Sequence, residues 1–177
     1  MKKDITKKVE GERIYLRLLR ESDATQEYCN WLNDPEVNKY LETREATIED
    51  VKKYIKERID SANCFFMGIF DKKNDKHIGN IKLEPIDWDK KSGITGILIG
   101  DKDYWGKGIG TEATKLMVDY GFNELGLKEI ELGVISENKA AIKVYENVGF
   151  VVDHIEKKAK KHGDIFYDMI VMKIFKK

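Results

Sequence analysis

The feature that most constrains this chain is a glycine-rich stretch at residues 103–113, with the sequence DYWGKGIGTEA. Its glycines, Gly106, Gly108 and Gly110, alternate with single residues between an apolar run and a helical pattern. Glycines let backbone N–H groups converge without obstruction by side chains, and a helix start adds four unpaired N–H groups and the positive end of its dipole. Because such an arrangement binds phosphate groups, the stretch predicts an anchor for a phosphorylated cofactor.

Two common phosphate-binding motifs do not explain this stretch. A P-loop needs G-x-x-x-x-G-K-[ST], and here Lys107 lies between glycines rather than before Thr111. Gly108, Gly110 and Ala113 match the dinucleotide-binding pattern G-x-G-x-x-A, but that pattern opens the first βαβ unit of a Rossmann domain. Here it lies past the middle of the chain, with too little sequence left for the remaining strands. A flexible glycine turn without a ligand is the structural alternative.

Length and charge limit the class of protein. The chain has 177 residues, which predicts a single domain over 1–177 with a loose N-terminal arm at 1–11. Lys and Arg together number 32, as do Asp and Glu, so the net charge is zero, which argues against nucleic acid as an obligate partner. The charged first ten residues and the absence of a segment of about 20 apolar residues predict no signal peptide, no membrane partner and a cytoplasmic location.

Hydrophobic periodicity predicts alternating strands and helices. Strands are expected at 13–20, 64–70, 77–86, 91–99, 128–136, 150–155 and 164–175, with a solvated lysine-rich loop at 157–161. Helices are expected before Asn33, from the N-cap Thr47 to Asn63, after the glycine loop, and over 138–149. Cys29 and Cys64 are expected in the core of a protein in a reducing compartment. The three histidines, His77, His154 and His162, are expected to be exposed and show no spacing for a metal.

This element order resembles the fold of the GNAT acyltransferases over about residues 12–174. The family's pyrophosphate loop, [Q/R]-x-x-G-x-[G/A], fits Gly108 and Gly110, although Trp105 stands at the Q/R position. The segment YWGKGIGTEA, residues 104–113, resembles the corresponding segment in the branch of the family that contains the ribosomal-protein N-terminal acetyltransferases. Residues 137–150 resemble the family's N-x-x-A-x-x-x-Y-x-x-x-G-F segment. The resemblance implies an α/β (α+β) fold of order β-α-α-β-β-β-α-β-α-β-β, whose single mixed, mostly antiparallel sheet has six to seven strands and about four flanking helices.

The resemblance also implies acetyl-CoA as cofactor. Coenzyme A would bind to the backbone at the splayed end of the strand before the loop, at Leu98 and Ile99, and to the side chain of Asn138. It would also bind the loop itself, at Trp105, Gly106, Lys107, Gly108, Ile109, Gly110 and Thr111. Tyr145 would be the general acid that protonates the departing thiolate. Asn138 and Tyr145 are seven residues apart, and thus on the same helix face. A core aromatic is the structural alternative for Tyr145.

A base and an acceptor site are less clearly indicated. Glu84, at a strand end before Pro85, is the best carboxylate candidate for the base, and a water chain ending on a backbone carbonyl would serve equally. The segment 31–44 is similar to enzymes that acetylate nucleotide-linked amino sugars. In such enzymes a tryptophan and an Arg/Tyr set, here Trp31, Tyr40 and Arg44, would hold the acceptor. A packed helix followed by a loop is the structural alternative for that segment.

The resemblance to the GNAT family therefore implies an acetyl-CoA-dependent N-acetyltransferase that moves the acetyl group directly to a primary amine in a ternary complex. No cysteine stands where an acetyl-enzyme would need one. The expected acceptor is a small molecule or a peptide, and the two alternatives are a protein N-terminus and a nucleotide-linked amino sugar. The sequence leaves open whether the protein forms a homodimer. The competing hypothesis is a non-catalytic module that binds or senses acetyl-CoA on the same fold.

Overall fold

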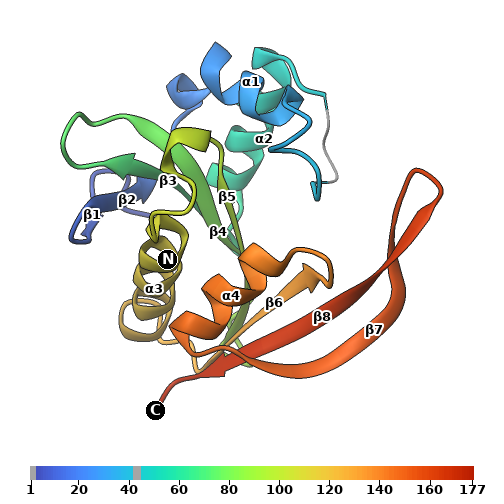
Figure 1. Ribbon diagram of the computed structural model, residues 1–177. Coiled ribbons are helices and arrows are strands. Elements are labelled where there is room, and N and C mark those ends of the chain that lie inside the picture. Colours follow the sequence, from blue (N-terminus) through green and yellow to red (C-terminus); the bar gives the residue numbers. More distant parts are fainter. Residues whose placement is uncertain (1–2, 42–44) are drawn as a thin grey trace.

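The computed structural model describes residues 3–41 and 45–177, and one mixed sheet organises them (Figure 1). The sheet has eight strands in the order β1-β2-β3-β4-β5-β6-β8-β7. In chain order the elements are β1 (Lys8–Glu10), β2 (Ile14–Leu18), α1 (Gln26–Asn33), α2 (Ile48–Asp60), β3 (Phe65–Asp71), β4 (His77–Asp87), β5 (Ser92–Ile99), α3 (Ile109–Asn123), β6 (Glu129–Ile135), α4 (Lys139–Val148), β7 (Val151–His162) and β8 (Ile165–Phe175). The predicted fold class and element order are confirmed, apart from one extra strand at the N-terminus.

The extra strand, β1, corrects the prediction that residues 1–11 form a loose arm. It pairs antiparallel with β2, with Val9 opposite Leu16. Val9 packs against the main core, and Lys7 forms an ion pair with Glu124 at 2.5 Å. Charged residues are common on edge strands because they discourage pairing with other chains, so a charged composition hid this strand from sequence reasoning.

The last two strands form a long hairpin, and this corrects the predicted loop at 157–161. The lysine-rich residues belong to β7, which reaches the turn at Gly163. A register irregularity between Glu156 and Lys160 absorbs extra residues, and Asp168 on β8 accepts a hydrogen bond of 3.0 Å from the Lys158 backbone N–H. A bulge of this kind lets a strand continue through a sequence without regular alternation. In Figure 1 the tip of the hairpin extends away from the body of the protein.

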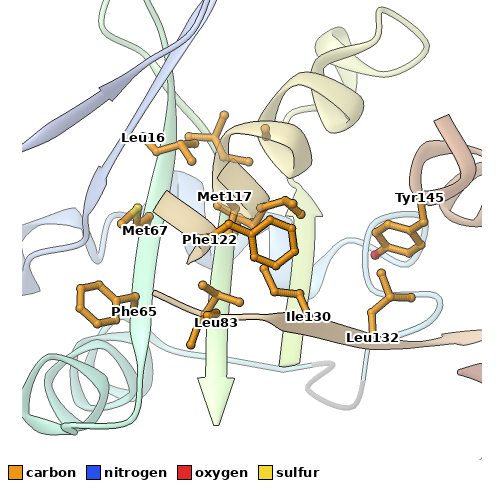
Figure 2. Packing of buried hydrophobic residues seen from close by; sticks show 14 of the residues in the cluster. Leu16, Phe65, Met67, Leu83, Met117, Phe122, Ile130, Leu132 and Tyr145 are labelled. Atoms are coloured by element: carbon orange, nitrogen blue, oxygen red, sulfur yellow. The ribbon is translucent and has the colours of Figure 1, made fainter. Parts of the chain in front are cut away.

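Two hydrophobic clusters cover the two faces of the sheet. The larger one joins the sheet to α3 and α4, and includes Met67, Met117, Leu132 and Tyr145 (Figure 2). The smaller one joins the sheet to α1 and α2. Alternation along each strand divides side chains between the clusters, since successive residues point to opposite faces. In β3, for example, Met67 belongs to the larger cluster and Phe66 to the smaller.

His77 is half-buried, which corrects the expectation that it is exposed. Its ring stacks on Phe70 at a centroid distance of 4.9 Å and meets the edge of Trp31 at 5.0 Å. Its Nε2 lies 2.7 Å from Oδ1 of the buried Asn80. Burial lowers the pKa of His77, so the neutral ring is favoured in the folded protein. The polar sequence 71–76 before it forms an exposed turn, but the ring itself reaches back under α1.

Trp31 is a core residue, 6% exposed, in the cluster under α1. Its indole lies directly against Gly100, the residue that follows β5: a Cβ placed at Gly100 would come within 2.1 Å of the Trp31 ring. The helix α1 can therefore approach the end of β5 only because Gly100 has no side chain. This contact places Trp31 under the sheet end and leaves little of its surface for a ligand.

We predict that Gly100→Ala destabilises the protein by about 1–3 kcal/mol, because overpacking forces the indole and backbone apart. Gly96→Ala is the matched control in the same region, since its new Cβ would meet nothing nearer than the Lys82 Cε at 4.0 Å. It should leave stability within about 0.5 kcal/mol of the parent, as an uncrowded substitution does. Urea unfolding of the two variants tests this, and equal stabilities would contradict the packing of Trp31 on Gly100.

Candidate active site

The site begins where two neighbouring strands separate. β5 and β6 are parallel, and their pairing consists of Ser92 with Glu129, Gly93 with Ile130 and Ile94 with Glu131. Beyond these pairs β5 continues along β4 to Ile99, whereas β6 continues along β8 to Ile135. The two strands diverge in Figure 1, and this divergence opens the middle of the sheet.

The separation leaves backbone groups of β5 without a neighbouring strand. The Gly100 N–H donates to the Ile78 carbonyl at 3.0 Å, so alternate residues, including Leu98, turn their backbone groups toward β4. Ile97 and Ile99 then turn theirs toward the gap. The Ile99 carbonyl accepts from the Trp105 indole N–H at 2.8 Å. The prediction named Leu98 and Ile99. The register turns the backbone of Leu98 toward β4 and that of Ile99 toward the gap, and Leu98 lines the cleft.

A cleft of about 920 Å³ lies at this gap. Helices α1 and α2 form one wall, the exposed parts of β4 and β5 form the floor, and β6, α4 and the β7–β8 hairpin form the other wall. The residues with polar groups on its lining include Tyr54, Arg58, Lys82, Asn138, Tyr145 and His162. The cleft therefore gathers side chains from both halves of the chain around the point where the sheet is open.

The glycine loop lies next to the gap and leads into α3. Gly106 and Gly108 have φ values of 71° and 78°, which favour glycine, and Gly108 is the N-cap of α3 without any side-chain cap. The first N–H groups of α3 are therefore open to an anionic ligand. Of the predicted loop contacts, Lys107 and Trp105 are exposed, whereas the Ile109 side chain is buried in the core, so that only its backbone can serve a ligand.

Arg13 and Glu112 hold this loop in place, and sequence reasoning missed both. The Arg13 guanidinium donates to the Lys107 carbonyl at 2.6 Å and to Glu112 at 2.9 Å. The other Glu112 oxygen accepts from the Arg13 backbone N–H at 2.8 Å. Burial would raise the pKa of Glu112, but these hydrogen bonds outweigh burial and lower the pKa. The one available signal was a carboxylate, Glu112, in the first turn of the helix after a phosphate-binding loop.

Tyr145 and Asn138 both lie on the cleft, from α4. Tyr145 belongs to the larger core cluster and is 6% exposed, and its hydroxyl makes no hydrogen bond within the part of the chain that the structure describes. Figure 2 shows its ring beside Leu132 of β6. Burial raises the pKa of Tyr145 to about 12. Asn138 is the N-cap of α4, because its side-chain oxygen accepts from the Ala141 N–H at 3.3 Å.

The predicted base, Glu84, has a different position from the one expected. Its Oε2 atom accepts from Arg58 at 3.0 Å and from Lys82 at 3.1 Å, and Glu84 is not part of the cleft lining. Both cations bind the same carboxylate oxygen, and the structure does not bring Glu84 to the cleft with the other predicted residues. His162, expected to be exposed, is instead partly buried on the cleft.

The predicted acceptor residues do not all lie on the cleft. Tyr40 lines the cleft, and its hydroxyl lies 3.4 Å from the Glu137 carbonyl. Trp31 is buried under Gly100 and does not line the cleft, which corrects its assignment. Arg44 lies outside the described residues. Over residues 3–41 and 45–177, no group of three or more His, Cys, Asp or Glu side chains could hold a metal ion, and no helix is long and apolar enough to cross a membrane.

Comparison with known proteins identifies the family. The model of the Acetyltransferase (GNAT) domain matches residues 13–151, which is most of the chain. A Bacillus subtilis protein named "Probable N-acetyltransferase YjcK" is 32% identical over 176 residues, covering 94% of this chain and 96% of its own. The chain therefore belongs to the GNAT acetyltransferase family, and the predicted family and enzyme class, an N-acetyltransferase, are confirmed.

Solved structures share the fold. The spermidine N-acetyltransferase from Vibrio cholerae, in complex with CoA and spermine, has a TM-score of 0.84 at 24% identity, covering 92% of this chain and 95% of its own. The ribosomal-protein-S5-alanine acetyltransferase from Vibrio fischeri has a TM-score of 0.77 at 23% identity, covering 95% and 96%. At these identities the likeness supports the fold and leaves the acceptor open.

We predict that Gly108→Ala weakens acetyl-CoA binding about tenfold or more, because the loop N–H groups tilt when Gly108 leaves its φ of 78°. Gly126→Ala is the matched control, since Gly126 has a φ of 71° just beyond the other end of α3. Both changes should cost about 1–2 kcal/mol of stability. Calorimetric titration with acetyl-CoA separates them, and equal affinities in the two variants would contradict the placement of the phosphates.

We predict that Tyr145 stays protonated until the pH approaches 12. Because its pKa is raised in the folded state, its contribution to stability is full below pH 10 and is lost between pH 10 and 12. Comparison of the tyrosinate absorbance of the parent with that of Tyr145→Phe measures this directly. The two titrations should coincide up to about pH 11. A difference that appears near pH 10 would show a solvent-exposed hydroxyl.

Proposed function

We propose that this protein transfers an acetyl group from acetyl-CoA directly to a primary amine while both substrates are bound. The position of Tyr145 carries the proposal: the residue belongs to the core cluster on one side of the sheet and also lines the cleft at the gap between β5 and β6. The residues present fit the cofactor. The open first turn of α3 suits a pyrophosphate, and the backbone of Ile97 and Ile99 suits the amide groups of the pantetheine arm.

The thioester of acetyl-CoA supplies an activated acetyl carbon and a thiol leaving group. The amine nitrogen forms the new C–N bond as the C–S bond breaks, and the electron pair stays on sulfur. Tyr145 gives its proton to that sulfur. Burial raises the pKa of Tyr145 to about 12, so the hydroxyl carries a proton at neutral pH. We expect the hydroxyl to serve this step because Tyr145 lines the cleft and no hydrogen bond within the described residues holds its hydroxyl elsewhere.

Direct transfer agrees with the state of the cysteines. Burial raises the pKa of Cys64 to about 11 and also raises the pKa of Cys29. At neutral pH both side chains are thiols, and a thiolate is the form that accepts an acyl group. An acetyl-cysteine intermediate therefore has little support in this chain.

The attacking amine must lose a proton to become neutral. Glu84 is held by two cations, and the cleft carboxylate of Asp50 accepts from the Thr47 N–H at 2.9 Å. Water in the open cleft, or the imidazole of His162, can take the proton in their place. The two acceptor classes, a protein N-terminus and a nucleotide-linked amino sugar, both present a primary amine. The names of the similar structures, a spermidine and a ribosomal-protein acetyltransferase, support an amine acceptor in general.

Tyr145→Phe tests the proposal, because it keeps the ring and removes the proton donor. We predict that turnover falls on the order of 10²-fold, the usual range for general acid catalysis, whereas acetyl-CoA affinity stays within about twofold. Tyr120→Phe is the matched control: Tyr120 is another partly buried tyrosine, on α3, and lies outside the cleft. It should keep parental turnover.

The measurement is release of free thiol with a panel of amines, together with calorimetric affinity for acetyl-CoA. Parental turnover in Tyr145→Phe would remove this residue from the mechanism. Binding of acetyl-CoA without acetyl transfer to any amine would favour the non-catalytic sensing module instead.

A further inference from the structure

A cluster of charged side chains forms part of the cleft floor between α2 and β4. Arg58 donates to the Glu84 Oε2 at 3.0 Å, and Lys82 donates to the same oxygen at 3.1 Å. Lys82 also donates to the Tyr54 hydroxyl at 3.1 Å, and the Arg58 guanidinium lies 3.3 Å from the centre of the Tyr54 ring. Two cations are therefore fixed side by side by one carboxylate and one tyrosine.

The cations face the cleft and the carboxylate does not. Arg58, Lys82 and Tyr54 line the cleft, whereas Glu84 is not one of its lining residues. The side chains of Arg58 and Lys82 are only 18% and 31% exposed, so water solvates their charges incompletely. Glu84 binds both cations through one oxygen, and Glu57 lies 4.0 Å from the Arg58 guanidinium. Among the described residues that line the cleft, the cations Arg58, Lys82 and Lys160 outnumber the carboxylates Asp50 and Glu45. Partly desolvated charges of this kind are stabilised by a further ion of opposite sign.

Lys82 stays charged in this environment. Burial acts to lower its pKa, but Tyr54 and Glu84 outweigh burial, and the pKa is raised. The neighbouring strand leaves room for a ligand beside it: Lys82 pairs with Gly96 of β5, and the Lys82 Cε lies 4.0 Å from the position that a Gly96 Cβ would occupy. The absence of a side chain at Gly96 thus keeps the lysine accessible from the gap.

We propose that Arg58 and Lys82 form an anion subsite for the acceptor, so that the natural substrate is a primary amine that also carries a phosphate or a carboxylate. This inference rests on the proposed acetyl transfer and narrows its substrate class. A guanidinium beside an ammonium provides several N–H donors on one side of the anion, which suits either oxyanion. Glu84 then acts as the positioning residue for both cations rather than as the base.

Matched acceptors test the subsite: phosphoethanolamine against ethanolamine, and 4-aminobutyrate against its amide. In the parent, kcat/KM should be at least tenfold higher for the anionic member of one pair, and the preferred pair distinguishes phosphate from carboxylate. Lys82→Gln should remove most of the preference through KM, Lys82→Glu should reverse it, and Lys82→Arg should retain it. Lys90→Gln is the control, since the side chain of Lys90 is 80% exposed in the turn after β4. It should keep both the preference and the activity.

A second measurement does not need turnover. Inorganic phosphate added to the acetyl-CoA complex should shift the NMR signals of the Lys82 and Arg58 side chains in the parent, and Lys82→Gln should lose the response of Arg58. A preference for the neutral acceptors, a preference unchanged in Lys82→Gln, or no response to phosphate would each overturn the anion subsite. Failure of the acetyl transfer itself would be recognised separately, as acetyl-CoA binding without thiol release for every amine.

Discussion

The site depends on one constraint, the loss of pairing between β5 and β6 after Ile94 and Glu131. Each strand keeps its other neighbour, so the sheet opens without leaving either strand unsupported. The opening leaves backbone groups of β5 without a neighbouring strand and lets Tyr145, which belongs to the core on one side of the sheet, line the cleft. Hydrogen bonds that a closed sheet would satisfy internally remain for a ligand, which explains how a buried location can still bind an extended molecule.

Local patterns in the sequence were enough to predict most of the fold. The alternation in 13–20 and 128–136, the Thr47 cap and the glycine loop are each set by neighbouring residues, and the structure has all of them. The predicted loop, Asn138 and Tyr145 also lie beside the gap or on the cleft. Short-range chemistry determines these features, because turns, caps and helix faces require particular residues at fixed spacings.

Long-range contacts were beyond sequence reasoning. Arg13 and Glu112 are 99 residues apart, and the position of Glu112 after the glycine loop does not indicate which cation it meets. Glu84 was selected for its position at a strand end. Its neighbour Lys82 is two residues away on the same strand, but Arg58 comes from a helix whose packing the periodicity does not specify. Trp31 is of a residue type often found in binding sites, but it is buried because Gly100 lets α1 approach the end of β5. Such residues obtain their roles from tertiary packing, which a single sequence does not encode locally.

Residue-resolved hydrogen exchange, with and without coenzyme A, tests the central claim most directly. If the separated end of β5 and the start of α3 hold the cofactor, the amides of Ile97, Ile99 and Gly110 should exchange more slowly when it is bound. The Leu98 amide provides an internal reference, because it already faces β4 and should change little. Protection of Leu98 with no change at Ile97 and Ile99, or no protection at any of these amides, would contradict the account.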